Sequence, residues 1–419
     1  MDKKPVGNSY FFNKGGLEAG LTGLFLFIII AGVLFIGNYR FVQAAPGGTD
    51  FLYRWLPTRL VLLNEYDNPY SPEVEYQVEL VHHGHAHEGD ETPGIFAYPY
   101  YTMGVFLPFA FIGDFSIARA VWMTFMELAH LGIAFLSLRI INFTPTKFLG
   151  FALVLFSLLT ADFAQALVDG NPSSLAAFFV ILALFFISNE RDVLAGIFLA
   201  FSTIKPQLVI LFFPFVWIWA FSVKRLKIIY ASGATLFVLL SVSFLMQPNW
   251  ILEFYKDLTT YVDVAKPSTP RAILSFWMPV PIANIISIIL SIVSIYIVFQ
   301  VVRSSFGKDF SEFFWASSLI FVLMPLTGIT SAKSNYIAML PAIVLFLWVW
   351  SVHIKLKEIW LAFFLILWMF LSWLFFFAGR NWTVEGTLIY FVDFYPLPLF
   401  LLVLTFWSKP LQKTYEFRH

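Results

Sequence analysis

The sequence predicts an all-α polytopic membrane protein, with about twelve transmembrane helices and further juxtamembrane helices on the outer face. Of its 419 residues, 59% are hydrophobic and only 12% are charged, whereas soluble domains contain about 25% charged residues. A single aqueous core of this size could not bury 51 Phe and 14 Trp side chains. A transmembrane barrel would need polar residues at alternating positions. The composition therefore excludes soluble enzymes and disordered chains.

The charged residues and the cysteine count exclude other classes. Lys and Arg together number 26, as do Asp and Glu, so the bulk charge indicates no nucleic-acid partner. The chain has no Cys, which excludes disulfides, thiol redox chemistry and iron–sulfur clusters.

Apolar runs long enough to cross about 30 Å of hydrocarbon identify the spans in order. The predicted spans cover residues 17–37, 117–141, 148–166, 172–188, 193–206, 207–222, 228–246, 281–302, 313–328, 335–352, 358–377 and 387–407. The first run follows Lys3, Lys4 and Lys14, and no small-residue cleavage site follows it. We therefore expect it to be retained as a span.

The basic residues predict the orientation of the spans. The turns at 224–227 and 355–357 carry clustered lysine and arginine, and they lie inside when both termini are cytoplasmic. The loops 38–116 and 247–280 then lie outside. Residues 95–112 are apolar enough to suggest a thirteenth span, but counting them would invert every later turn. We expect this segment to form a juxtamembrane or re-entrant helix on the outer face.

Ionisable residues near the outer ends of the spans are candidates for a site. Lys147 marks the inner surface, so Asp162 lies about 22 Å along a helix that rises 1.5 Å per residue. Asp169 lies near the membrane boundary, and Lys205 lies about 20 Å beyond Asp192. Charges at such depth mark a cavity or a substrate path. The alternatives are that Lys205 snorkels to the headgroups and that Asp162 makes a polar helix contact.

The first long loop places another carboxylate, Asp50, directly after a Pro-Gly-Gly turn. Under the predicted topology, Asp50, Asp162, Asp169, Lys205 and Lys333 all fall at or just below the outer surface. Lysines there could hold a phosphate, and an acid could take a proton from an attacking hydroxyl. This combination suits a phosphorylated lipid as substrate. The alternative for Asp50 is a helix cap or a solvated loop acid.

Two further groups have both a functional and a structural interpretation. Glu127 and His130 share one face of the second span, where they could relay protons or form helix–helix hydrogen bonds. A histidine-rich loop could bind zinc or a similar metal, or could be a solvated loop with adventitious metal affinity. Its histidines are His82, His83, His85 and His87. Walker, GxGxxG and HExxH motifs are absent from the sequence.

Several short motifs occur in a fixed order between about residues 45 and 215. They are Thr49-Asp50-Phe51, Asn68-Pro69-Tyr70, Tyr98-Pro99, Asp169-Gly170-Asn171 and Ala195-Gly196 with Ile204-Lys205-Pro206. This set resembles motifs of the GT-C superfamily of integral-membrane glycosyltransferases, which use polyprenyl-phosphate sugars as donors. Within it, the likeness is to family 87, the polyprenol-phosphate-mannose-dependent mannosyltransferases. A late turn, residues 331–336, stands where that family has a Ser-Pro…His-Tyr turn.

The resemblance implies transfer of a hexose, expected to be mannose, from a polyprenyl-phosphate donor to a lipid or glycan acceptor on the outer face. The anomeric carbon would be inverted, and Asp50 would act as general base. The resemblance also implies a GT-C-like module over residues 1–246 and a variable C-terminal module over 247–419. A divalent cation is an open possibility, with Asp50 and Asp169 as candidate ligands, and no other cofactor is expected.

The remaining roles are implied residue by residue. The residues expected to position the acceptor or a metal are Asp162, Asp169 and Asn171. The residues expected to hold the donor phosphate are Lys205, Lys333 and Arg271. The donor pocket is expected to contain Tyr98, Gln207, Asn335 and Tyr336.

Two other classes of function stay open. A secondary transporter suits twelve spans but would require two similar halves, and the 38–116 loop has no counterpart in the second half. A non-catalytic membrane subunit that binds a lipid, or a partner in a membrane complex, would explain why the Gln and His of two family motifs are missing. We expect the chain to lie among the lipids of a prokaryotic plasma membrane.

Overall fold

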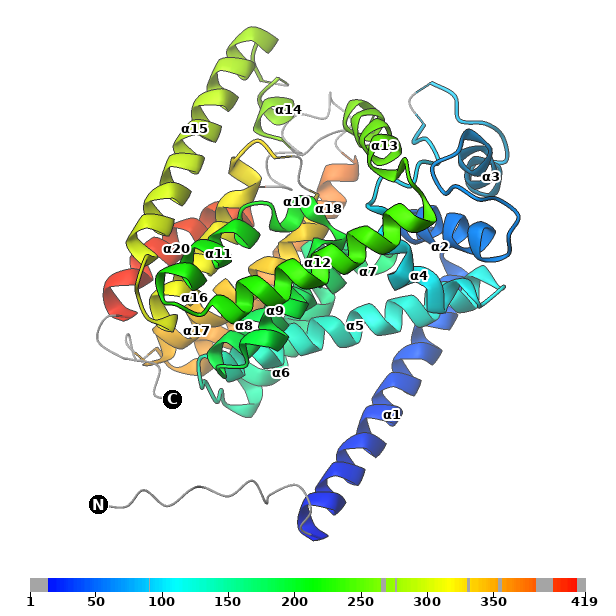
Figure 1. Ribbon diagram of the computed structural model, residues 1–419. Helices are drawn as coiled ribbons and strands as arrows, with labels where there is room; N and C mark the ends of the chain where they lie inside the picture. Colours follow the sequence, from blue (N-terminus) through cyan, green and yellow to red (C-terminus); the bar gives the residue numbers. More distant parts are fainter. Residues whose placement is uncertain are drawn as a thin grey trace.

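The computed structural model describes residues 14–412 except 90, 265–268, 276, 330–331, 353–355 and 382–394. All regular elements in this part of the chain are helices (Figure 1), which confirms the predicted all-α class. The N-terminal elements are α1 (Lys14–Ala44), α2 (Thr49–Leu62), α3 (Pro72–His82), η1 (Tyr100–Thr102) and α4 (Met103–Ala110). The middle elements are α5 (Phe115–Ile140), α6 (Lys147–Leu159), α7 (Ala161–Asp169), α8 (Ser173–Ser188), α9 (Asp192–Phe201), η2 (Ser202–Ile204), α10 (Pro206–Val209), α11 (Phe212–Ser222) and α12 (Leu226–Met246). The last elements are α13 (Trp250–Val264), α14 (Pro270–Leu274), α15 (Val280–Ser305), α16 (Phe310–Leu323), η3 (Met324–Leu326), η4 (Lys333–Met339), α17 (Leu340–Val352), α18 (Glu358–Asn381) and α20 (Pro396–Gln412).

Six helical segments in the described residues are long and apolar enough to cross a membrane, which supports an integral membrane protein. They are α1, α5, α12, α15, η4 with α17, and α18. The pair α6 and α7 is a seventh candidate, bent by 49°. The other predicted spans coincide with shorter apolar helices, namely α8, α9 with η2, α11, α16 with η3, and α20. Each predicted span thus contains helix, although residues 387–394 of the last lie outside the described part. The count of twelve crossings stays a prediction.

The apolar segment 95–112 does not form a thirteenth long helix. It contains a stretch without regular structure, the short η1 and the eight-residue α4. Eight helical residues rise about 12 Å, well short of the hydrocarbon thickness. The side of the membrane on which this segment lies stays a prediction.

Most helices share one hydrophobic core, to which both predicted modules contribute. Trp122 of α5, Phe212 of α11, Trp315 of α16 and Leu345 of α17 are all buried in it. The division into two modules therefore stays a prediction. Figure 1 shows α2, α3 and α13 grouped on one side of this helical body, while α1 runs away from it.

Polar contacts between helices account for Glu127 and His130 on α5. Asn38 Nδ2 of α1 donates to Thr124 Oγ1 at 3.0 Å and to Glu127 Oε2 at 2.7 Å. His130 hydrogen-bonds with Ser157 O at 2.8 Å, and its other ring nitrogen contacts a serine hydroxyl of α8. Glu127 and His130 thus make the helix–helix hydrogen bonds of the structural interpretation.

Candidate active site

Asp50 is held at the start of α2 by a turn with little free space. Gly48 has a φ of +83°, and a Cβ added there would lie 2.4 Å from Nε of Arg119. This buried arginine of α5 donates from Nη1 to Ala45 O at 3.1 Å and from Nη2 to Val168 O at 2.9 Å. The guanidinium therefore fixes the turn before Asp50 against the end of α7.

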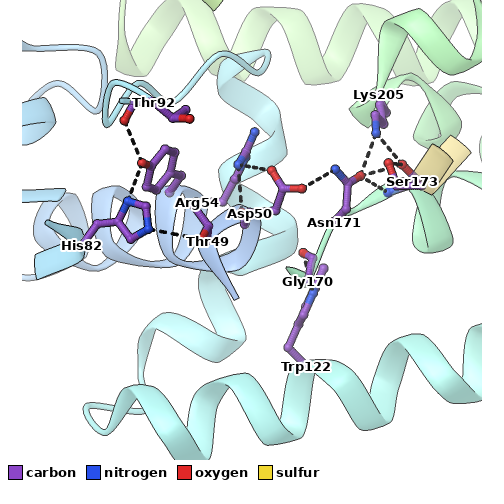
Figure 2. Close-up of polar contacts among 12 residues, drawn as sticks. Thr49, Asp50, Arg54, His82, Thr92, Trp122, Gly170, Asn171, Ser173 and Lys205 are labelled. Atoms are coloured by element: carbon purple, nitrogen blue, oxygen red, sulfur yellow. Dashed lines mark hydrogen bonds and ion pairs between the residues drawn. The ribbon is translucent and has the colours of Figure 1, made fainter. Parts of the chain in front are cut away.

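A second close approach joins α2 to the turn between α7 and α8. Gly170 has a φ of +72°, and an added Cβ would lie 2.5 Å from Cβ of Phe51. Trp122 Nε1 donates to Gly170 O at 2.9 Å (Figure 2), and the Phe51 and Trp122 rings stack with centroids 5.5 Å apart. Because Asn171 follows this glycine and Asp50 precedes this phenylalanine, the contact brings the two polar side chains together.

Both oxygens of the Asp50 carboxylate accept a hydrogen bond. Oδ1 accepts from Arg54 Nη1 at 3.0 Å, and Oδ2 accepts from Asn171 Nδ2 at 2.7 Å (Figure 2). The Arg54 guanidinium lies over the buried Tyr98 ring, 4.4 Å from its centroid. The Asp50 side chain is still 28% exposed, against 3% for Arg54. The carboxylate is thus oriented by two donors and remains reachable for a substrate.

Asn171 connects Asp50 to a buried lysine. Its Oδ1 accepts from Lys205 Nζ at 2.7 Å and from the backbone N–H and Oγ of Ser173 at 3.0 and 2.5 Å. Lys205 Nζ also hydrogen-bonds to Ser173 Oγ, and the residue is only 2% exposed. Among the described residues, no carboxylate oxygen lies within 4.0 Å of this ammonium. Lys205 lies at a break between η2 and α10. The break forms because Pro206 cannot continue the helix that ends at Ile204.

Two other predicted residues form a separate buried pair. Lys333 Nζ lies 3.8 Å from Asp162 Oδ1, with exposures of 4% and 8%. The element that begins at Lys333, η4, still contacts the site around Asp50. Ser173 Oγ lies 2.9 Å from Asn335 Oδ1 and 3.3 Å from Ser334 Oγ. The Asp162–Lys333 pair and the hydrogen-bonded group around Asp50 are therefore connected through η4.

The other predicted site residues differ in burial. Asp169 at the end of α7 and Arg271 on α14 are exposed. Gln207 is half-buried, and Tyr336 is 1% exposed. Their predicted roles stay predictions.

One of the four clustered histidines, at the end of α3, lies beside the site. His82 Nε2 is 3.3 Å from Thr49 Oγ1, and its Nδ1 is 2.8 Å from the Tyr53 hydroxyl (Figure 2). Partial burial and the neighbouring His83 lower the pKa of His82, which favours the neutral imidazole. It therefore supports the first turn of α2, next to Asp50, as a neutral hydrogen-bonding group.

Sequence reasoning missed three residues of this arrangement. Arg54 follows Asp50 at the i,i+4 spacing of helical ion pairs, so the sequence did contain that signal. Ser173 follows Asn171 by two residues, the spacing of a side-chain turn. Arg119 had no sequence signal, because its partners lie far away along the chain.

An apolar cavity of about 430 Å³ lies between α2, α4 and α12. Its lining includes Val61, Leu62, Leu107, Val242 and Met246.

The aromatic wall of this cavity contacts the segment before Lys205. Tyr101, which lines it, donates from its hydroxyl to Thr203 O at 3.0 Å. The next residue, Thr102, donates from Oγ1 to Ile204 O at 3.3 Å. The cavity wall and the buried lysine are therefore parts of one connected structure.

Comparison with known families favours one of the open classes of function. Residues 96–272 match the model of glycosyltransferase family 87. The match confirms the resemblance predicted from the motifs and supports a membrane glycosyltransferase, with a sugar donor and an acceptor as its substrates. It includes Asn171 and Lys205, whereas Asp50 and Lys333 lie outside it. No curated protein and no solved structure matches the chain.

Proposed function

We propose that this protein transfers a hexose, expected to be mannose, from a polyprenyl-phosphate donor to a hydroxyl of a lipid or glycan acceptor. The reaction would take place at the outer face of a prokaryotic plasma membrane, with both chain termini in the cytoplasm. The observation that carries the proposal is the connection of a buried ammonium, Lys205, through Asn171 to a partly exposed carboxylate, Asp50.

The surroundings of Lys205 favour an anionic substrate. Removing an ammonium from water costs several kcal/mol after relaxation of the protein, and here the side chain contacts neutral oxygens of Asn171 and Ser173. A phosphate that binds beside Lys205 would supply the counter-charge and accept charge-assisted hydrogen bonds. The same ammonium would stabilise the negative charge that develops on a departing phosphate.

The proposed reaction has a simple balance of bonds. The acceptor oxygen attacks the anomeric carbon from the side opposite the phosphate, and the bond from that carbon to the phosphate oxygen breaks. The polyprenyl phosphate leaves with the electron pair, and the acceptor hydroxyl proton passes to Asp50. Each Asp50 oxygen accepts one hydrogen bond in the structure, which leaves a further lone pair for the hydroxyl.

The apolar cavity suits the lipid part of such a donor. Its volume of about 430 Å³ falls within the range of about 300–1,000 Å³ that is usual for ligand sites. Tyr101 joins its wall to the residues just before Lys205. A donor with its chain in the cavity would carry its phosphate towards the polar site.

The test measures transfer by the purified full-length chain with polyprenyl-phosphate mannose, and with the glucose donor for comparison. We expect Asp50→Asn to lower the rate by about 10²–10⁴-fold, the usual contribution of a general base. Asp67→Asn, at an exposed loop position, is the matched control and should keep the wild-type rate. Full turnover by Asp50→Asn would remove Asp50 from the mechanism. Co-purified polyprenyl phosphate without any transfer would favour the lipid-binding subunit instead.

A further inference from the structure

We propose that Glu75, Glu79 and His87 form a binding site for one divalent transition-metal ion, with Zn²⁺ as the favoured ion. The site lies on α3 and the loop that follows it, and the proposal is independent of the transfer reaction. Ligand atoms of the three side chains all lie within 4.8 Å of one another. Glu75 and Glu79 are four residues apart on α3, so they share one face of the helix.

The loop after α3 brings the third ligand to this face. Glu79 Oε2 accepts from the His87 backbone N–H at 3.1 Å, and Oε1 accepts from the Gly94 N–H at 3.2 Å. His87 Nδ1 is 2.5 Å from Glu79 Oε1. The Glu79 side chain is only 4% exposed. Its carboxylate is therefore already oriented by backbone donors, as outer-shell hydrogen bonds orient ligands in metal sites.

The charges of the site favour a cation. Glu75 and Glu79 place carboxylate oxygens within 4.8 Å of each other, so the two groups repel each other when both are ionised. A divalent ion between them would remove this repulsion. The His87 side chain is 40% exposed, so an ion can enter from solvent.

The donor set points to zinc. Imidazole with carboxylates suits Zn²⁺ and its first-row neighbours, whereas Ca²⁺ and Mg²⁺ prefer oxygen ligands alone. Bonds of about 2.0–2.2 Å in a tetrahedral site would place ligand atoms about 3.4 Å apart. The His87–Glu79 contact would open by roughly an ångström, and Glu75 would move inward. A water molecule would complete the tetrahedron.

The ion would stabilise the structure next to Asp50 without taking part in the transfer reaction. It would hold the loop after α3 on its helix, and His82 at the end of α3 contacts Thr49 and Tyr53 of α2. Of the histidines predicted from the sequence, only His87 belongs to the site. His85 is exposed and hydrogen-bonds with Ala86 O at 2.7 Å.

The experiment titrates Zn²⁺ into the metal-stripped full-length protein in detergent, with Co²⁺ absorption as a second readout. We expect one ion per chain, a rise in melting temperature on Zn²⁺ addition, and at least tenfold weaker binding by Glu75→Gln and by His87→Ala. The control, His85→Ala, keeps an intact ligand set and should bind like the wild type.

Three results would overturn the proposal. They are no binding, several ions per chain, and a loss of affinity in His85→Ala as large as in Glu75→Gln. The last two would indicate adventitious binding by the histidine-rich loop. Glu75→Gln and His87→Ala are both tested, so that misfolding of one variant does not decide the result. Glu75→Gln conserves the size of a half-buried side chain.

Discussion

Replacing Lys205 with Met separates the role of its charge in catalysis from its role in folding. Lys205 Nζ makes hydrogen bonds to two neutral oxygens, each contributing about 1.5–3 kcal/mol for a charged donor. Desolvation of the buried ammonium costs several kcal/mol, so the two terms nearly cancel. After the replacement, Asn171 Oδ1 keeps both Ser173 donors. We therefore expect the free energy of unfolding to change by less than about 2 kcal/mol.

The transfer rate of Lys205→Met should fall much more. Removing one group that stabilises negative charge in a transition state typically costs about 10²–10³-fold in kcat, or about 2.7–4 kcal/mol. The assay measures kcat with polyprenyl-phosphate mannose beside thermal unfolding of the same preparation. Lys227→Met, at an exposed position on α12, is the matched control. A Lys205→Met protein with wild-type kcat would refute the assignment of the phosphate to this lysine.

Lys333→Met should give the opposite pattern. Lys333 is paired with the buried Asp162 at 3.8 Å, and breaking a buried ion pair from one side destabilises by about 3–5 kcal/mol. We therefore expect a clear loss of thermal stability. A stable Lys333→Met protein with a strongly reduced kcat would instead give Lys333 the phosphate-binding role.

Three further predictions concern packing, topology and pH. Gly170→Ala should destabilise the protein by about 2–4 kcal/mol in thermal unfolding, because it adds positive-φ strain to an overpacked contact; Gly233→Ala, a helical position with open space around it, should not. The chain has no Cys, so single cysteines can report the orientation of the protein. D67C should react with an impermeant maleimide in intact cells, whereas K227C should react only after permeabilisation. The reverse result would show that the predicted orientation is wrong. Burial raises the pKa of Asp257 to about 7, so this carboxyl ionises at lower pH in the unfolded chain than in the folded protein. The free energy of unfolding therefore falls as the pH rises from about 4 to 7. Asp257→Asn should therefore melt higher than the wild type at pH 8, and equal melting temperatures there would contradict the shift.

The helices could be predicted because apolar runs identify them directly, but breaks inside the runs could not. Residues 148–166 were predicted as one straight span, and the depth of Asp162 was calculated on that basis. The structure ends α6 at Leu159 and begins α7 at Ala161 with a 49° bend. Neither Gly nor Pro marks this point, so the sequence had no local signal for it.

The sequence placed Asp50, Asp162, Asp169, Lys205 and Lys333 at one level, but it could not show which of them touch. Depth along a helix follows from counting residues, whereas contacts depend on helix rotation and on distant packing.

The contact that joins Asp50 to Asn171 depends on such packing. Gly170 allows Phe51 to approach it closely, and Trp122 holds the turn from α5. Only the three-dimensional packing distinguishes a lysine paired with a carboxylate from one that contacts neutral oxygens. That distinction assigns the phosphate to Lys205 in the proposed mechanism, because an ammonium already paired with Asp162 would have to give up its counter-ion to bind a second anion.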